Sequence, residues 1–173
     1  MSSTLSNLTY HIVFSTKYHE PLITPKLRDA LYPYICGIVR NKGGALIRVG
    51  GVANHLHLVV RLRPDIALSD MVRMVKTNSS KWINEQNLDD GGRFAWQSGY
   101  GAFTVSQSQL PVLIDYVERQ EEHHRERSFE EEFVTILKKH GVEYDERYLF
   151  DVEGEQEVKK RPTPPCGPVS KSK

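Results

Sequence analysis

Residues 54–62 read Asn-His-Leu-His-Leu-Val-Val-Arg-Leu, a stretch of strand-forming residues that begins at a turn-forming asparagine. Apolar side chains alternate with a second, mainly polar set: Leu56, Leu58, Val60 and Leu62 against His55, His57, Val59 and Arg61. Because successive side chains of a strand point to opposite faces, we expect one face packed under helices and the other open and largely polar. The two imidazoles share that second face, roughly 7 Å apart along the strand.

The segments around this strand complete a β-α-β-β-α-β order. Further strands are predicted over residues 8–16, 45–52 and 99–106, where β-branched and aromatic residues gather. Apolar residues at helical spacing predict one helix from Thr24-Pro25 to Gly43 and another over residues 68–83, with a turn at residues 89–92. The predicted fold class is therefore α+β: a ferredoxin-like sheet with helices on one face, plus C-terminal helices.

The C-terminal helices carry the next polar side chains of interest. A helix capped by Ser106 or Ser108 is predicted to run from residue 110 to about 124, so Tyr116 and Gln120, four apart, lie on one helical face. Residues 128–131 fit a capping box, which opens a last helix ending near residue 141.

Composition limits the classes of protein that this chain can belong to. Its 173 residues suggest one domain, predicted over residues 1–150, followed by a disordered, Pro-rich tail over residues 151–173. The net charge is only +1, with a mildly basic body and an acidic C-terminal part, which permits nucleic-acid binding without requiring it. Cys36 and Cys166 predict no disulfide framework. No apolar run is long enough to span a membrane and no secretory pattern opens the chain, so we expect a cytoplasmic protein.

Two strand histidines beside a helical tyrosine and glutamine would place a metal site next to a nucleophile. Each residue alone has a simpler interpretation: strand histidines are commonly surface residues, and helical tyrosines commonly keep their hydroxyl in water. Together they offer neutral ligands with positions left for water or phosphate oxygens. The metal stays open, because imidazole favours zinc or manganese whereas phosphate chemistry usually employs magnesium. His123 and His124 follow on and could join the site, but they are expected at the surface.

Several segments in order resemble the single-tyrosine transposases of the HUH superfamily, the insertion-sequence type and the REP-associated tyrosine transposases. The matching segments cover roughly residues 8–150 and comprise Tyr10-His-Ile-Val-Phe-Ser-Thr-Lys17, His55-Leu-His57, Trp96-Gln-Ser-Gly-Tyr-Gly-Ala-Phe-Thr-Val-Ser106, Tyr116-Val-Glu-Arg-Gln120, His123-His124 and Ser128-Phe-Glu-Glu131. The His-x-His triplet alone is loose, whereas the whole set is specific.

This resemblance implies a transposase that cleaves and rejoins single-stranded DNA at hairpin-bearing ends through a 5′-phosphotyrosine. It implies that His55, His57 and Gln120 hold a divalent ion, magnesium or manganese, and that Tyr116 is the nucleophile. It further implies a homodimer at the bacterial nucleoid, and leaves open whether Tyr116 acts in its own active site or in the partner's.

Two other functions stay open: a domesticated, transposase-derived nucleic-acid binding protein without strand transfer, and a metal hydrolase that uses activated water. Basic side chains that are candidates for phosphate contact, about half of them at best, are Lys17, Arg48, Arg61, Arg63, Arg73, Lys76 and Lys81. Aromatic residues that would either stack on bases or join the core are Phe94, Trp96 and Tyr100.

Overall fold

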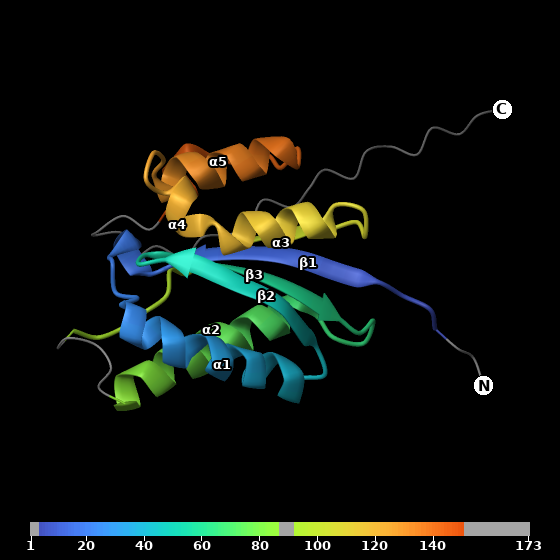
Figure 1. Cartoon of the computed structure of the whole chain (residues 1–173), viewed down its shortest axis with the longest axis horizontal. Coiled ribbons are helices and arrows are strands. Elements are labelled where there is room, and N and C mark those ends of the chain that lie inside the picture. Colours follow the sequence, from blue (N-terminus) through green and yellow to red (C-terminus); the bar gives the residue numbers. More distant parts are fainter. Residues whose placement is uncertain (1–3, 87–91, 151–173) are drawn as a thin grey trace.

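A four-stranded antiparallel sheet forms the centre of the molecule (Figure 1). The computed structural model describes residues 4–86 and 92–150. The strands are β1 (Leu8–Ser15), β2 (Ala45–Val52), β3 (His55–Leu62) and β4 (Gly101–Thr104), in the spatial order β2-β3-β1-β4. β3 pairs with β1 in a register that sets His55 opposite Ser15. The predicted element order and the α+β class are confirmed.

Two helices, α1 (Pro25–Asn41) and α2 (Leu68–Gln86), lie together on one face of the sheet (Figure 1). The apolar side chains of β3 and β1 that point to this face meet theirs in the largest core cluster. Thr24 caps α1 by accepting a hydrogen bond from the Leu27 backbone N–H, and Pro25 occupies the first helical position, as predicted. Phe94 and Trp96 are buried in the same cluster, which confirms the core alternative for these two aromatic residues.

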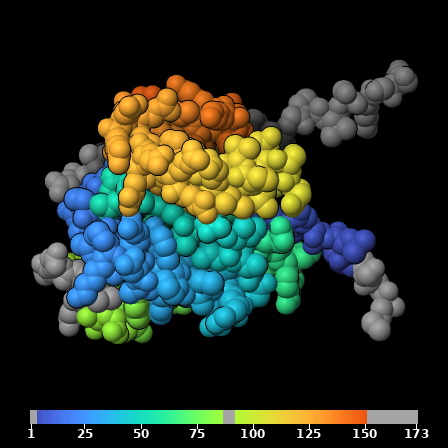
Figure 2. Space-filling model, viewed as in Figure 1, coloured from blue at the N-terminus to red at the C-terminus, as the bar shows by residue number. Residues whose placement is uncertain are grey.

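The second face of the sheet is covered, and the prediction of an open face is wrong. Figures 1 and 2 show α3 (Leu110–Glu118), α4 (Gln120–His123) and α5 (Phe129–Lys139) lying against the sheet on the side opposite α1 and α2. Val13 and Phe103 pack with the apolar face of α5, and Val59 packs with α3. The alternating side chains of β3 therefore enter two buried layers, an apolar layer under α1 and α2 and a layer with the histidines under α3–α5.

Most predicted boundaries agree with the structure to within a few residues. β2 and β3 span the predicted residues, whereas β1 ends one residue early, at Ser15, and Thr16 makes an isolated bridge to Trp96. β4 has four residues, fewer than predicted. Short 3-10 turns, η1 (Lys17–His19) and η2 (Glu146–Tyr148), follow β1 and α5.

The helix predicted over residues 110–124 is broken. α3 ends at Glu118, Arg119 takes a non-helical conformation, and α4 starts at Gln120. Gln109, not Ser106 or Ser108, occupies the N-cap position of α3, where it makes no side-chain cap. The capping box at Ser128 and Glu131 is confirmed.

Two predictions, the turn at residues 89–92 and the tail after residue 150, fall wholly or mainly outside the described residues. Within the described ranges, no helix combines the length and the apolar character that a membrane span requires.

Candidate active site and metal centre

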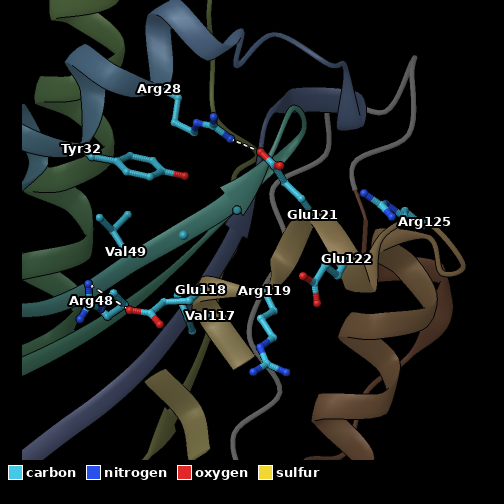
Figure 3. Close-up of a pocket in the computed structure, with 12 residues that line it drawn as sticks. Arg28, Tyr32, Arg48, Val49, Val117, Glu118, Arg119, Glu121, Glu122 and Arg125 are labelled. Carbon is cyan, nitrogen blue, oxygen red and sulfur yellow. Dashed lines mark hydrogen bonds and ion pairs between the residues drawn. The ribbon is translucent and has the colours of Figure 1, made fainter. Parts of the chain in front are cut away.

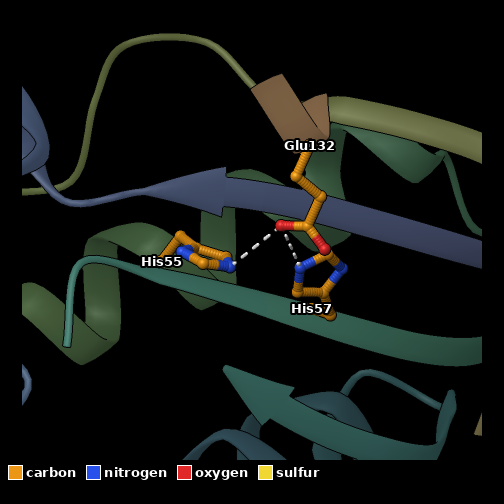
Figure 4. A group of neighbouring side chains, drawn as sticks. All are labelled: His55, His57 and Glu132. Carbon is orange, nitrogen blue, oxygen red and sulfur yellow. Dashed lines mark ion pairs between the residues drawn. The ribbon is translucent and has the colours of Figure 1, made fainter. Parts of the chain in front are cut away.

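β3 presents the imidazoles of His55 and His57 to the same side of the sheet, where α5 passes over them (Figure 4). His57 lies opposite Val13 on one neighbouring strand and Gly50 on the other. Both histidine side chains are 0% exposed. They are therefore interior groups held between the sheet and the C-terminal helices, and not the surface residues that strand histidines commonly are.

Glu132 on α5 brings a carboxylate to the two imidazoles. Its Oε2 lies 3.3 Å from Nε2 of His55 and 3.4 Å from Nε2 of His57 (Figure 4). One ligand atom from each of the three residues lies within 4.8 Å of the others. Two imidazole nitrogens and a carboxylate oxygen are ligands that zinc, manganese and related divalent ions accept.

The hydrogen-bond pattern around His55 fits a cation. Nδ1 of His55 lies 2.8 Å from Oδ1 of Asn54, so in the neutral ring Nδ1 carries the hydrogen and Nε2 presents its lone pair. That Nε2 lies 3.1 Å from Oε1 of Gln120 and 3.3 Å from Oε2 of Glu132. Nε2 of His57 is buried and has no hydrogen-bond partner. Lone pairs thus converge on one point, as around a bound ion.

The charges of the site are balanced by His124. Burial opposes ionisation of Glu132, but the close approach of the His124, His55 and His57 imidazoles outweighs it and holds the pKa of the carboxyl far below its usual range. Burial alone would lower the pKa of His124, yet Glu132, whose Oε2 lies 2.7 Å from Nε2, raises it. Burial lowers the pKa of His55 to about 4. Near pH 7 His55 is therefore neutral, which is the form that binds metals.

Tyr116 on α3 reaches the same carboxylate from the other side. Its hydroxyl donates a hydrogen bond to Oε1 of Glu132, and its ring meets that of His57 edge-on, with centroids 5.8 Å apart. Burial, together with the charge of Glu132, raises the pKa of the hydroxyl above its ordinary value. One carboxylate oxygen thus faces the imidazoles and the other faces the phenol.

Gln120 is buried at the start of α4, despite the break after α3. Its Nε2 donates to Oε1 of Glu132 at 3.1 Å, which turns its own carbonyl oxygen toward His55. The four side chains predicted to form a site, His55, His57, Tyr116 and Gln120, therefore lie together. Whether they act as ligands and nucleophile stays a prediction.

Three further residues belong to this group. The sequence raised His124 only as an alternative and pointed to neither of the other two. Glu132 has a signal in the sequence, because its spacing from Phe129, Phe133 and Ile136 puts a carboxylate on the apolar face of α5. His124 is predicted at the surface, but it folds inward from the end of α4 to reach Glu132. His11 alternates with apolar residues of β1, and its Nε2 lies 2.8 Å from Nδ1 of His57.

The basic residues predicted to contact DNA are spread over the molecule. Four form ion pairs with a neighbouring carboxylate: Arg48, Arg63, Arg73 and Lys81. Lys76 donates to backbone carbonyls of Gln97 and Gly99, and Arg61 donates weakly to Thr9. Lys17 follows β1 at the end of the sheet where His55 lies. Arg73, Lys76 and Lys81 are on α2, across the sheet from Tyr116, whereas Arg48 pairs with Glu118 on the helix that carries Tyr116.

A cavity of about 370 Å³ separates α1 and β2 from the α3–α4 junction (Figure 3). Two ion pairs cross it, Arg28 with Glu121 and Arg48 with Glu118. Both pairs are partly exposed, so each stabilises the fold by about 1 kcal/mol or less. They also fix the positions of the helices that carry Tyr116 and Gln120, because one pair joins α3 to β2 and the other joins α4 to α1.

Comparison with known proteins gives consistent matches. Residues 4–120 match the family described as "Transposase IS200 like". The ISDra2 transposase TnpA of Deinococcus radiodurans is 25% identical over 118 residues, covering 65% of this chain and 84% of that protein. The transposase of insertion sequence element IS200 of Salmonella typhimurium is 25% identical over 124 residues, covering 69% and 81%.

Two solved structures share the fold. A Deinococcus radiodurans protein described as a transposase superposes with a TM-score of 0.57 at 22% identity, covering 69% of this chain and 95% of that one. A REP-associated tyrosine transposase bound to a REP hairpin gives 0.55 at 12% identity, covering 92% and 100%. At these identities the likeness concerns the fold alone.

Proposed function

The chain belongs to the IS200-like transposase family, and we propose that it cleaves and rejoins single-stranded DNA through a covalent link to Tyr116. The observation that carries this proposal is the position of Glu132, whose two carboxylate oxygens face the imidazole pair and the Tyr116 hydroxyl. A nucleophile and a set of metal ligands thereby share one buried carboxylate.

The residues have distinct roles in this proposal. His55 and His57 hold a divalent ion, with oxygen ligands from Gln120 and Glu132. A bound ion would polarise a phosphoryl oxygen and neutralise charge that develops at phosphorus. The Tyr116 oxygen attacks phosphorus, and the bond from phosphorus to the 3′ oxygen breaks. The products are a 5′-phosphotyrosine and a strand with a free 3′-hydroxyl.

Glu132 supports the attack by accepting the hydrogen bond of the Tyr116 hydroxyl. A phenol is a poor nucleophile at neutral pH, and burial raises its pKa further, so its proton must leave as the oxygen–phosphorus bond forms. The carboxylate orients the hydroxyl through this hydrogen bond, and the proton passes on to water, because a carboxyl whose pKa lies far below its usual range does not hold a proton near neutral pH. The covalent link keeps the energy of the broken bond, so a second 3′-hydroxyl can later attack it and rejoin strands.

The DNA substrate belongs to the same proposal. One structural relative is bound to a REP hairpin, which supports hairpin-bearing single strands as the substrate of this chain. A homodimer at the bacterial nucleoid completes the proposal, on the family resemblance alone.

The test is covalent capture of DNA. Purified protein is mixed with hairpin-bearing single strands from the DNA flanking its gene, with Mn²⁺ or Mg²⁺, and resolved on a denaturing gel. We expect an adduct that is lost in Tyr116→Phe and in His57→Ala. Cleavage that survives Tyr116→Phe but not His57→Ala would replace the proposal with a metal hydrolase. Hairpin binding without cleavage by the wild type would indicate a binding protein.

A further inference from the structure

A second cavity, of about 530 Å³, lies between α3 and α5. Tyr116 and Glu132 are part of its lining, whereas the cavity beside Arg28 includes neither. Its volume is within the range of about 300–1,000 Å³ typical of small-ligand sites. The cavity therefore adjoins the hydroxyl that attacks phosphorus in the proposed reaction.

The position of this cavity limits what can occupy it. A phosphate attacked by Tyr116 must lie within about 3–3.5 Å of the hydroxyl oxygen. The nucleotide joined to that phosphate must then occupy adjacent space. The cavity supplies that space, since it runs from Tyr116 along α3 to Val112 and along α5 to Lys139.

The lining has the chemistry of a nucleotide site. Val112, Leu113 and Ile136 form an apolar wall, and Val112 is 66% exposed although it is large and hydrophobic. Arg127 and Lys139 contribute positive charge, and in the described part of the chain neither forms an ion pair with a carboxylate. Apolar surface suits a base or sugar, and unpaired cations suit phosphate oxygens.

We propose that the cavity between α3 and α5 receives one nucleotide of the single-stranded substrate, the one joined to the phosphate that Tyr116 attacks. Arg127 and Lys139 contact its sugar–phosphate backbone, and the base lies against Val112. This inference rests on the proposed function and adds to it a protein site for a nucleotide next to the cut.

The first test measures the charged contacts. A fluorescein-labelled, mixed-sequence hexanucleotide is titrated with the full chain carrying Tyr116→Phe, so that no adduct forms, at several salt concentrations. Arg127→Ala and Lys139→Ala should each weaken binding and lower the salt slope by about 0.7. Arg125→Ala and Lys138→Ala are the matched controls, because both side chains are exposed and line no part of this cavity. Equal behaviour of all four variants would overturn the assignment.

The second test measures the base contact. Affinity is compared between the hexanucleotide and an abasic hexamer with the same phosphates. In the parent protein the hexanucleotide should bind more tightly than the abasic hexamer. Val112→Ser should reduce this preference by about threefold, because apolar surface is lost beside the base. Val142→Ser, at another exposed valine, should leave the ratio unchanged. A ratio that Val112→Ser does not alter would contradict a base in this cavity.

The outcomes separate the two proposals. If the wild type forms an adduct but all the binding variants have equal affinity, the nucleotide site is refuted and the transposase proposal is retained. Selective loss of binding in Arg127→Ala, Lys139→Ala and Val112→Ser without any adduct in the wild type would support the site and refute the chemistry. Unchanged thermal unfolding of each variant excludes misfolding as the cause.

Discussion

At the scale of single residues, we expect the contact with His11 to decide which nitrogen of His57 carries the hydrogen. With Nε2 of His11 2.8 Å from Nδ1 of His57, a hydrogen between them belongs on Nδ1 when Nε2 of His57 binds an ion. We expect His11→Phe to lower the affinity for Mn²⁺ by about 10–100-fold, the usual cost of losing such a supporting contact. Isothermal titration calorimetry of the DNA-free protein measures this directly.

A conservative change separates tautomer control from packing. His11→Gln keeps an acceptor near Nδ1 of His57 and should retain much of the Mn²⁺ affinity that His11→Phe loses. Equal affinities in His11→Phe and wild type would show that His11 has only a packing role.

A second prediction at this scale concerns acid stability without metal. Because burial lowers the pKa of His55 to about 4, its folded value lies below the unfolded value of about 6.5. Above that unfolded value both states are neutral. As the pH falls below about 6.5, His55 becomes protonated in the unfolded chain but stays neutral in the folded protein. The free energy of unfolding therefore decreases until about pH 4, where folded His55 is protonated as well. The decrease is about 3 kcal/mol for this group.

Urea unfolding in EDTA at pH 7 and pH 4.5 measures that loss, with His55→Gln as the non-titrating comparison. The wild type should lose more stability than the variant on acidification. Parallel losses in the two proteins would show that His55 is protonated without cost.

At the scale of elements, the close approach of α3 to β2 depends on Gly50. A Cβ at this position would lie 2.1 Å from the backbone oxygen of Val117, the residue after Tyr116. We expect Gly50→Ala to lower the free energy of unfolding by about 1–3 kcal/mol, as overpacking does, and to reduce adduct yield because α3 must move. Denaturant unfolding and the adduct gel are the two measurements.

Gly37→Ala is the matched control, since a Cβ there meets nothing within 4 Å and the residue lies inside α1. It should gain about 0.5–1 kcal/mol from the higher helix propensity of alanine. If Gly50→Ala were as stable as the wild type, the contact between β2 and α3 would be looser than described.

The helices and strands also show which parts of the fold local sequence patterns can predict. β2 and β3 were predictable to the residue, because Gly44 and Asn54 mark their starts locally and alternation runs through the whole of β3. The break at Arg119 was not, because residues 118–124 contain no Gly or Pro that would mark the end of a helix locally. The covering of the second face by α3–α5 is a tertiary event, which alternation in β3 could not distinguish from exposure to solvent.

At the scale of the whole molecule, the candidate site depends on a helix outside the family match. The match ends at residue 120, whereas Glu132 comes from α5. The sequence pointed to His55, His57, Tyr116 and Gln120 through spacing and resemblance. Spacing could have put Glu132, unlike Glu130 and Glu131, on the apolar face of α5, but it could not show that this face meets the histidines, because that depends on the packing of α5 on Phe103 and Val13.

The last prediction tests whether α5 contributes to metal binding or only covers the sheet. Glu132→Gln preserves the shape of the side chain but removes the charge that faces His55 and His57. It should therefore lower Mn²⁺ affinity by at least about tenfold in calorimetry. The pKa of His124, followed by NMR, should also fall, because Glu132 raises it in the wild type. Glu130→Gln on the same helix is the control, since that carboxylate contacts His19 instead. Equal Mn²⁺ affinities in both variants and the wild type would leave Gln120 to supply the third ligand alone.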